Sequence, residues 1–539
     1  MKAIDLLFLG SLVLEPAEAA CSVSCSADRF KDVLPPTASI ISAVRVANGS
    51  AYGEGKADVA YPTNPTSLPE LCAVTVNVSS SSMSNYRFGL FLPTAWNSRF
   101  LAVGNGGFSG GINWLDMGAG VRYGHAVVST DTGHNSTSGD LTWSLDNPER
   151  KKDFGYRAIH GSVELGKKMV EAFYGEKIAY SYYNGASTGG RQGLKEAQIS
   201  PDSFDGMIIG APAWWTSHLQ TWTTKVAMYN LPASDPKHVP AQLFTTIAQE
   251  VVKQCDDADG IADGIVSYPD HCSFNVSTLL CSESGANSSA CLTPVQMATV
   301  QNFYADYKPE GKFAFPGMEV GSEPQWPFLL GGSEPSTLGY GYVQYFMYDD
   351  PDWNWPQFND SIVWEADAAD PGDATADDYD SLAKFRDRGG RIFLYHGLAD
   401  ALIPPGSSYV FYDKVAAALG GVEALQEWFR FFHVPGMQHV TGTAVDAPWY
   451  FAGSGAAGAL GTNVYSTPGF EDREHDAMLA LMAWVEKGIP IDQIVATTWR
   501  QQTVPGSGVL RQRPLCPHPK KQTYDGKGDP DKPESFSCE

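Results

Sequence analysis

The sequence predicts an α/β fold with a mostly parallel sheet and one large insertion. Six short apolar runs end in or near glycine, and their apolar residues are continuous, as in strands covered on both faces. Helical patterns lie between them, for example at 158–175 and 473–488. Between residues 212 and 389 the alternation stops, and Trp, Tyr, Pro, Asp and cysteine become frequent. Because this segment is too long for a loop, it is predicted to be a lid on the α/β core.

The predicted strands follow the chain in order, with the insertion between the fourth and the fifth. Their ranges are 99–107, 125–133, 178–187, 204–212, 390–400 and 427–436. The polar tail after residue 515 is irregular, and Cys516 and Cys538 are expected to staple it down.

Composition narrows the class of protein. The chain has 539 residues, of which 43% are apolar, so it can bury a large core. Its net charge of −24 argues against nucleic acid or an anionic membrane as a partner, because both require a basic face. Oligomeric state is not readable from these features.

Several features together predict a secreted, extracellular protein. Residues 1–19 have the pattern of a signal peptide, although Asp5 is unusual in its apolar part. Nine cysteines are also typical of an exported chain, and one of them must lack an intramolecular partner. Six glycosylation sequons begin at Asn48, Asn77, Asn135, Asn275, Asn287 and Asn359.

Ser187 is the candidate nucleophile. It is the serine of a Gly-x-Ser-x-Gly motif that follows a predicted strand and precedes a segment able to form a helix, as a nucleophile elbow requires. Ser109 lies in a second match to this motif. The residues after Ser109 have little helical character, so it is interpreted as a loop residue.

A serine nucleophile needs a base and an acid that orients the base. Asp400 ends the strand at 390–400, and His439 follows the next strand, which gives the order Ser, Asp, His of α/β-hydrolases. His396 and His433 are interpreted as structural histidines, since the first precedes the acid and the second lies within its strand.

The negative oxygen of the tetrahedral intermediate needs backbone N–H donors. Thr188, the residue after the nucleophile, is predicted to supply one. The glycine-rich stretch after the first predicted strand is the candidate for the second, with Gly107 favoured and Gly106 as the alternative.

An acidic loop between Cys255 and Cys272 carries Asp256, Asp259 and Asp263. Hard cations such as calcium bind carboxylate and carbonyl oxygens, and three crowded carboxylates repel each other without a cation. The spacing is not that of an EF-hand, so the residues alone leave both a calcium site and a solvated acidic turn open.

These motifs together resemble the fungal tannase and feruloyl esterase family, which is also similar to bacterial mono(2-hydroxyethyl) terephthalate hydrolases. The feruloyl esterase branch is the nearer one. The stretches that carry the resemblance are GNGGFSGG, STGGRQGLKE, GAPAWWTSHLQTW, FMYDDPDWNW, HGLADALIPP, VPGMQH and RPLCPHPK with YDGKGD. The resemblance implies an α/β-hydrolase fold, with a catalytic domain at 20–211 and 390–539 and a lid domain at 212–389.

The resemblance also implies disulfides and a structural calcium ion. The calcium ligands would be the side chains of Asp256, Asp259 and Asp263 and the carbonyls of Ile261 and Ile265. Cys21 would remain unpaired. The implied pairs are Cys25–Cys72, Cys255–Cys272, Cys281–Cys291 and Cys516–Cys538.

One expected disulfide is missing from the sequence. In the family, cysteines typically precede the nucleophile and follow the catalytic histidine, and they pair with each other. Here these positions hold Ala186 and Val440. No catalytic group is lost, so the chain is expected to be an active enzyme with reduced heat stability.

The resemblance implies an esterase that hydrolyses feruloyl or other hydroxycinnamoyl esters of plant cell-wall polysaccharide. A tannase acting on gallate esters is the alternative, and a non-catalytic polysaccharide-binding protein is disfavoured by the complete triad. Aromatic lid residues are expected to form the lid's core, with one or two contacting a phenolic substrate. The candidates are Trp214, Trp215, Trp222, Tyr348, Trp353, Trp355 and Phe358.

Overall fold

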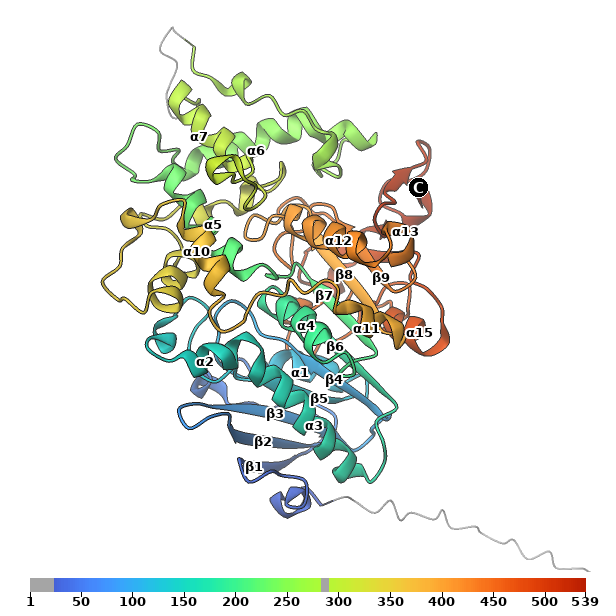
Figure 1. Ribbon diagram of the computed structural model, residues 1–539. Helices are drawn as coiled ribbons and strands as arrows, with labels where there is room; N and C mark the ends of the chain where they lie inside the picture. Colours follow the sequence, from blue (N-terminus) through green and yellow to red (C-terminus); the bar gives the residue numbers. More distant parts are fainter. Residues whose placement is uncertain (1–23, 283–289) are drawn as a thin grey trace, which may run out of the picture.

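A nine-stranded mixed sheet forms the centre of the protein in the computed structural model, which describes residues 24–282 and 290–539 (Figure 1). The strand order is β1-β2-β3-β5-β4-β6-β7-β8-β9. Strands β4 to β9 are parallel, whereas β1, β2, β3 and β5 form antiparallel pairs. The strands are β1 (Ala38–Val46), β2 (Leu71–Ser79), β3 (Asn85–Pro93), β4 (Arg99–Val103), β5 (Ala126–Thr130), β6 (Tyr180–Ala186), β7 (Gly206–Gly210), β8 (Arg391–Gly397) and β9 (Phe429–Val434).

The six predicted strands are confirmed as β4 to β9. The sequence analysis missed the antiparallel strands β1 to β3 and two small sheets near the C-terminus. These small sheets pair β10 (Ile494–Trp499) with β11 (Val509–Leu515) and β12 (Gln522–Tyr524) with β13 (Phe536–Cys538).

Helices cover both faces of the sheet. One face carries α3, α4, α11 and α12, and the other carries α1 and α15. The helical patterns at 158–175 and 473–488 are confirmed as α3 and α15. The helices are α1 (Trp114–Val121), α2 (Pro148–Lys152), α3 (Ala158–Tyr174), α4 (Thr188–Ile199), α5 (Thr216–Asn230), α6 (Ala241–Cys255), α7 (Pro294–Tyr304), α8 (Pro327–Leu330), α9 (Thr337–Gly341), α10 (Ile362–Ala369), α11 (Leu382–Asp387), α12 (Gly406–Leu419), α13 (Val422–Leu425), α14 (Ala456–Leu460) and α15 (Ala477–Lys487).

The expectation of little helical character after Ser109 is wrong, because α1 begins at Trp114. Glycines at 118 and 120 weaken the helical signal, but packing requires them. A Cβ on Gly118 would lie 2.2 Å from the Pro65 side chain, and one on Gly120 would lie 2.5 Å from that of Leu101. Ser109 itself lies in the loop before the helix, as expected.

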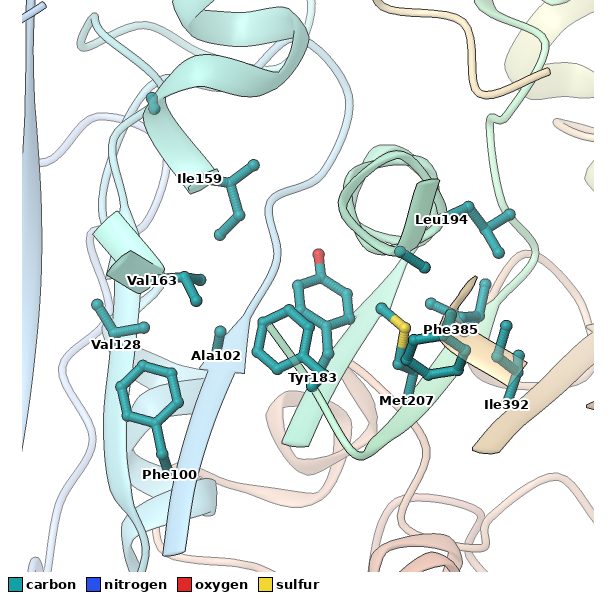
Figure 2. Close-up of a cluster of buried hydrophobic side chains, with 14 of the residues drawn as sticks. Phe100, Ala102, Val128, Ile159, Val163, Tyr183, Leu194, Met207, Phe385 and Ile392 are labelled. Carbon is teal, nitrogen blue, oxygen red and sulfur yellow. The ribbon is translucent and has the colours of Figure 1, made fainter. Parts of the chain in front are cut away.

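The core under α3 and α4 fixes the strand that carries the candidate nucleophile. Figure 2 shows Tyr183 of β6 between Ala102 of β4 and Met207 of β7, with Leu194 of α4 nearby. All four side chains are buried. Truncating such large buried side chains commonly costs about 2–5 kcal/mol of stability, so β6 and α4 form a rigid base for Ser187.

The predicted insertion lies between β7 and β8 and has a hydrophobic core of its own. Trp222, Phe303 and Trp326 are among its buried side chains. In Figure 1 the helices α5, α6, α7 and α10 gather beyond one end of the α/β domain. Its last helix, α11, instead packs on the sheet through Leu382 and Phe385.

All four disulfides implied by the resemblance are present. They join Cys25 to Cys72, Cys255 to Cys272, Cys281 to Cys291 and Cys516 to Cys538. The predicted signal peptide at 1–19, Cys21 and the sequon at Asn287 lie outside the described residues. No helix in the described ranges is long and apolar enough to cross a membrane.

Candidate active site

Ser187 lies at the sharp turn between β6 and α4. Its backbone has φ 59° and ψ −123°, a strained conformation for a residue other than glycine and typical of a nucleophile elbow. Two hydrogen bonds with the end of β7 hold this turn. The Ser187 N–H donates to the Gly210 carbonyl at 2.9 Å, and the Ala213 N–H donates to the Ser187 carbonyl at 2.9 Å.

Asp400 and His439 form the pair expected of an orienting acid and a base. Asp400 is fully buried just after β8, and His439 Nδ1 donates to its Oδ2 at 2.7 Å. This bond leaves Nε2 of His439 as the ring atom available to exchange a proton with a nucleophile.

Further donors stabilise the Asp400 carboxylate. The backbone N–H groups of Leu402 and Ile403 donate to Oδ1 at 2.8 and 3.0 Å. His396 Nε2 contacts Oδ2 at 3.1 Å. Burial raises the pKa of Asp400, but the charge on His439 and the hydrogen bonds from both histidines outweigh it, so the pKa lies well below its ordinary value.

The two histidines interpreted as structural lie outside the Ser187 cleft. His396 is fully buried and contacts Ser408 Oγ at 2.8 Å, which places it behind Asp400. His433 lies 3.4 Å from the Tyr409 hydroxyl, among other aromatic rings.

The glycine-rich loop after β4 lies beside the start of α4. The N–H of Gly106 donates to the Tyr61 hydroxyl at 2.9 Å, whereas the N–H of Gly107 has no acceptor within the described part of the chain. Gly107 has φ +54°, and a Cβ there would lie 2.7 Å from the Ser138 side chain. The geometry therefore favours Gly107 over Gly106 as the second oxyanion donor beside Thr188.

A buried amide pair ties this loop to the helix of the nucleophile. Asn105 N–H donates to Gln192 Oε1 at 3.0 Å, and Gln192 Nε2 donates to Asn105 Oδ1 at 3.1 Å. Asn105 Nδ2 also donates to the carbonyls of Gly111 and Thr130. Because Gln192 belongs to α4, movement of the loop relative to Ser187 would break both bonds.

Ser187, His439 and Gly107 line one open cleft of about 360 Å³. Its apolar wall includes Phe328 and Leu338 from the insertion. Phe328 is 60% exposed, which is unusual for a phenylalanine and makes its ring available to a ligand.

Phe328 is not among the aromatic residues that the sequence indicates as substrate contacts. None of the seven candidate aromatics is among the residues that line the cleft, so a contact between one of them and the substrate stays a prediction. Trp214, Trp222, Trp353 and Phe358 are instead buried. The Pro-Phe-Leu-Leu stretch of α8 has no local signal that could distinguish an exposed phenylalanine from a buried one.

In the acidic loop of the insertion, carboxylate oxygens accept hydrogen bonds from backbone N–H groups of the same loop. Asp256 Oδ1 accepts N–H bonds from Asp263 and Gly264 at 3.1 and 2.8 Å. Asp263 forms ion pairs with Arg511, at 3.1 Å, and with Arg513. The arginines of β11 thus relieve part of the repulsion that the sequence analysis assigned to a cation.

Two buried oxygens of this loop, Oδ2 of Asp259 and Oγ of the neighbouring Ser267, have no hydrogen bond within the described residues. A hard cation would satisfy Oδ2 of Asp259. No three His, Cys, Asp or Glu side chains converge closely enough to hold a metal ion within residues 24–282 and 290–539. The resemblance to the family implies that the carbonyls of Ile261 and Ile265 would complete the ligand set.

Ala186 and Val440, where the resemblance leads us to expect a disulfide, both line the cleft that contains Ser187 and His439. Val440 has φ +55°, an unfavourable conformation for a β-branched side chain.

Comparisons with known proteins match nearly the whole chain to one protein family. Residues 72–328 and 358–539 match the family model described as tannase and feruloyl esterase. A probable feruloyl esterase B-2 from Aspergillus terreus is 33% identical over 501 residues, which covers 91% of this chain and 92% of that protein. A probable feruloyl esterase B-2 from Aspergillus fumigatus is 32% identical over 550 residues, covering 100% and 99%.

Solved structures show the same fold. Feruloyl esterase B from Aspergillus oryzae has a TM-score of 0.86 and 31% identity, and covers 95% of this chain and 99% of its own. A tannin acyl hydrolase from Aspergillus niger has a TM-score of 0.72 at 21% identity, covers 96% and 95%, and supports the fold alone. With its mixed sheet and helices on both faces, the protein has an α/β-hydrolase fold, and it belongs to the tannase and feruloyl esterase family of carboxylic ester hydrolases.

Proposed function

We propose that the protein is a feruloyl esterase that cleaves hydroxycinnamoyl esters of plant cell-wall polysaccharide through Ser187, His439 and Asp400. The observation that carries this proposal is the 2.7 Å bond between His439 and the buried Asp400, in a cleft shared with Ser187. Relatives named feruloyl esterase B support the substrate class. The exposed ring of Phe328 adds an apolar surface suited to a phenolic ring.

The first half of the reaction forms an acyl-enzyme. His439 Nε2 removes the proton of Ser187 Oγ as Oγ attacks the ester carbonyl carbon. The N–H groups of Thr188 and Gly107 stabilise the resulting oxyanion. The carbon–oxygen bond to the alcohol then breaks, and His439 donates its proton to the leaving oxygen.

The second half hydrolyses the acyl-enzyme. Water loses a proton to His439 and attacks the same carbon, and the acid leaves as Ser187 recovers its proton. Asp400, acting only as a hydrogen-bond acceptor, holds the imidazole in one tautomer and stabilises its charged form in both halves.

The test is the rate of hydrolysis of methyl ferulate, methyl caffeate and methyl gallate by the protein and by Ser187→Ala. We expect turnover of both cinnamates that is lost in the variant, and slower turnover of gallate. Preference for gallate would replace the feruloyl assignment with a tannase while keeping the mechanism. Cinnamate turnover that survived in Ser187→Ala would refute the nucleophile.

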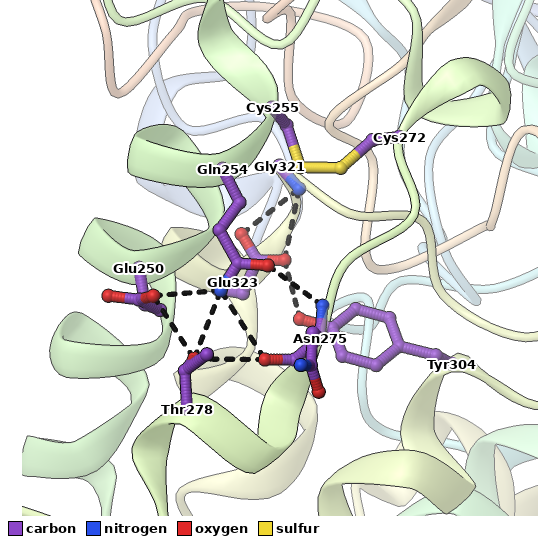
Figure 3. The surroundings of a disulfide bond; sticks show 9 residues. All are labelled: Glu250, Gln254, Cys255, Cys272, Asn275, Thr278, Tyr304, Gly321 and Glu323. Carbon is purple, nitrogen blue, oxygen red and sulfur yellow. Dashed lines mark hydrogen bonds between the residues drawn. A yellow bond between two sulfur atoms is a disulfide. The ribbon is translucent and has the colours of Figure 1, made fainter.

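We propose in addition that the loop at 256–265 holds a structural calcium ion. Its ligands would be the side chains of Asp256, Asp259 and Asp263 and the carbonyls of Ile261 and Ile265. The unsatisfied oxygen of Asp259 supports this proposal. A bound cation would stabilise the loop behind the Cys255–Cys272 disulfide, whose surroundings Figure 3 shows.

Chelation should therefore lower the melting temperature, and added calcium should restore it. Asp259→Asn should reduce this response, whereas Asp352→Asn, an exposed change elsewhere in the insertion, should keep it. Equal melting temperatures with and without chelator would contradict the calcium site.

The same proposal includes secretion of the enzyme into an oxidising space. Four disulfides within the described residues fit such a compartment. Activity and protein in the culture medium of an expressing host would support export, and retention inside the cells would contradict it.

A further inference from the structure

Asp116 is a carboxyl group on the wall of the catalytic cleft that the mechanism above does not use. It lines the cleft together with Ser187, Tyr61 and Gly455. The residue belongs to the first turn of α1, and Asn113 Nδ2 donates to its Oδ2 at 2.9 Å. The backbone of Gly455 supplies a second hydrogen bond.

This carboxyl group has no cationic partner. No Lys, Arg or His forms an ion pair with Asp116 within the described part of the chain. Its titratable neighbours are the hydroxyls of Tyr61, Tyr395 and Tyr450, which carry no positive charge. Burial raises the pKa of Asp116, and the bonds from Asn113 and Gly455 offset part of that rise.

An unpaired carboxyl group in a desolvated place costs stability, so its presence beside the nucleophile calls for a role in function. An ionised carboxylate is an acceptor only. The ligand group it suits is therefore a hydrogen-bond donor, and the donor that a neutral ester can bring to it is a hydroxyl.

The position of Asp116 indicates which hydroxyl. Asp116 and Gly455 also line a small space of about 30 Å³ next to the cleft, together with Asn184. Oδ1 of Asn184 is buried there without a hydrogen bond. Asp116 and Phe328, whose side chain is 60% exposed, both line the cleft. The acyl group whose carbonyl Ser187 attacks lies in this same cleft, so its ring hydroxyl is the donor that can approach Asp116.

We propose that Asp116 accepts a hydrogen bond from a ring hydroxyl of the phenolic acyl group and so selects hydroxylated rings as substrates. The proposal rests on the feruloyl esterase function proposed above and names the group that distinguishes its substrates. A phenolic hydroxyl is a strong donor to a carboxylate.

The experiment compares kcat/KM for methyl 4-hydroxycinnamate and methyl cinnamate, which differ by the one hydroxyl. The protein should prefer the hydroxylated ester by on the order of 10- to 100-fold, the usual range for a hydrogen bond to a charged group. In Asp116→Asn this preference should fall to within about threefold, with methyl cinnamate largely unaffected. The exposed substitution Asp352→Asn is the control and should keep the preference.

Three outcomes separate the inference from the function it rests on. If the unmodified protein hydrolyses neither cinnamate, the proposed function fails. If it hydrolyses both cinnamates equally, or if Asp116→Asn lowers both rates alike, the function stands and the role of Asp116 is refuted. Melting curves identify a variant that does not fold, and in that case the comparison of the two esters on the unmodified protein still decides.

Discussion

At the scale of single residues, the Asp400 carboxylate is the best-satisfied group of the candidate site. Four donors surround it, namely the rings of His439 and His396 and the N–H groups of Leu402 and Ile403. Because its pKa lies well below the ordinary value of about 3.9, it remains ionised throughout neutral pH. Its contribution to stability is fully present above that ordinary value and is lost only as the pH falls further toward the folded-state pKa.

Gln192 is predicted to position the oxyanion loop without touching the substrate. Gln192→Leu removes both bonds to Asn105, so kcat should fall on the order of 10- to 100-fold with a smaller change in KM. Gln198→Leu is the matched control, because Gln198 is buried in the same helix and donates instead to the Ala376 carbonyl at 3.0 Å. An equal loss of kcat in both variants would show that helix stability, not loop position, is responsible.

At the scale of elements, strands with a continuous apolar pattern could be predicted from sequence, and strands defined by their partners could not. The parallel strands β4 to β9 are buried on both faces, so each appears in the sequence as a continuous run of apolar residues. The antiparallel strands β1 to β3 depend on pairing with each other and with β5, which a local pattern does not reveal. Helix α1 was also not predicted. Its glycines have a weak helix propensity, and tertiary packing overrides that propensity.

We predict that stability depends on pH through Glu323. This residue lies in the short 3₁₀ helix Glu323–Gln325 of the insertion. Its carboxyl group accepts hydrogen bonds from Gly321 N–H and Tyr304 Oη (Figure 3). Burial raises its pKa from 4.5 to about 7. The folded state therefore holds the proton more tightly, and stability should fall as the pH rises from about 4.5 to about 7, by roughly 3 kcal/mol at most.

Glu323→Gln lacks the Glu323 carboxyl group and should make this decline shallower, while Glu319 and Asp131, whose pKa values are also raised, keep part of it. Melting temperatures measured at about pH 5 and about pH 8 test the sign worked out above. Glu334→Gln, an exposed change in the same insertion, should leave the decline as it is. A decline in Glu323→Gln as steep as in the unmodified protein would rule out Glu323 as its source.

At the scale of the whole molecule, the cleft is assembled from segments far apart in the chain. The cleft is lined by Tyr61, the 104–116 segment, Ser187, Phe328 and His439, which the fold of the sheet and the insertion brings together. The order and strand-end placement of Ser187, Asp400 and His439 could be predicted, because that pattern is common to α/β-hydrolases. Phe328, Asp116 and Gln192 could not, since their roles arise from contacts across the cleft.

The family resemblance leads us to expect that a disulfide between positions 186 and 440, which hold Ala186 and Val440, would stabilise the protein. Oxidised Ala186→Cys/Val440→Cys should be more stable than the parent by about 2–4 kcal/mol, because a cross-link between β6 and the His439 loop restricts the unfolded chain. Replacing a β-branched residue at φ +55° should add a smaller gain. Melting curves under oxidising and mild reducing conditions separate the two effects, and no gain on oxidation would contradict the prediction.

The most direct test of the account is mass spectrometry of the protein quenched during turnover of methyl ferulate. The account predicts a feruloyl adduct on the peptide that contains Ser187, and none in Ser187→Ala. An adduct on another residue, or undiminished turnover by Ser187→Ala, would contradict the proposal that Ser187 forms the acyl-enzyme.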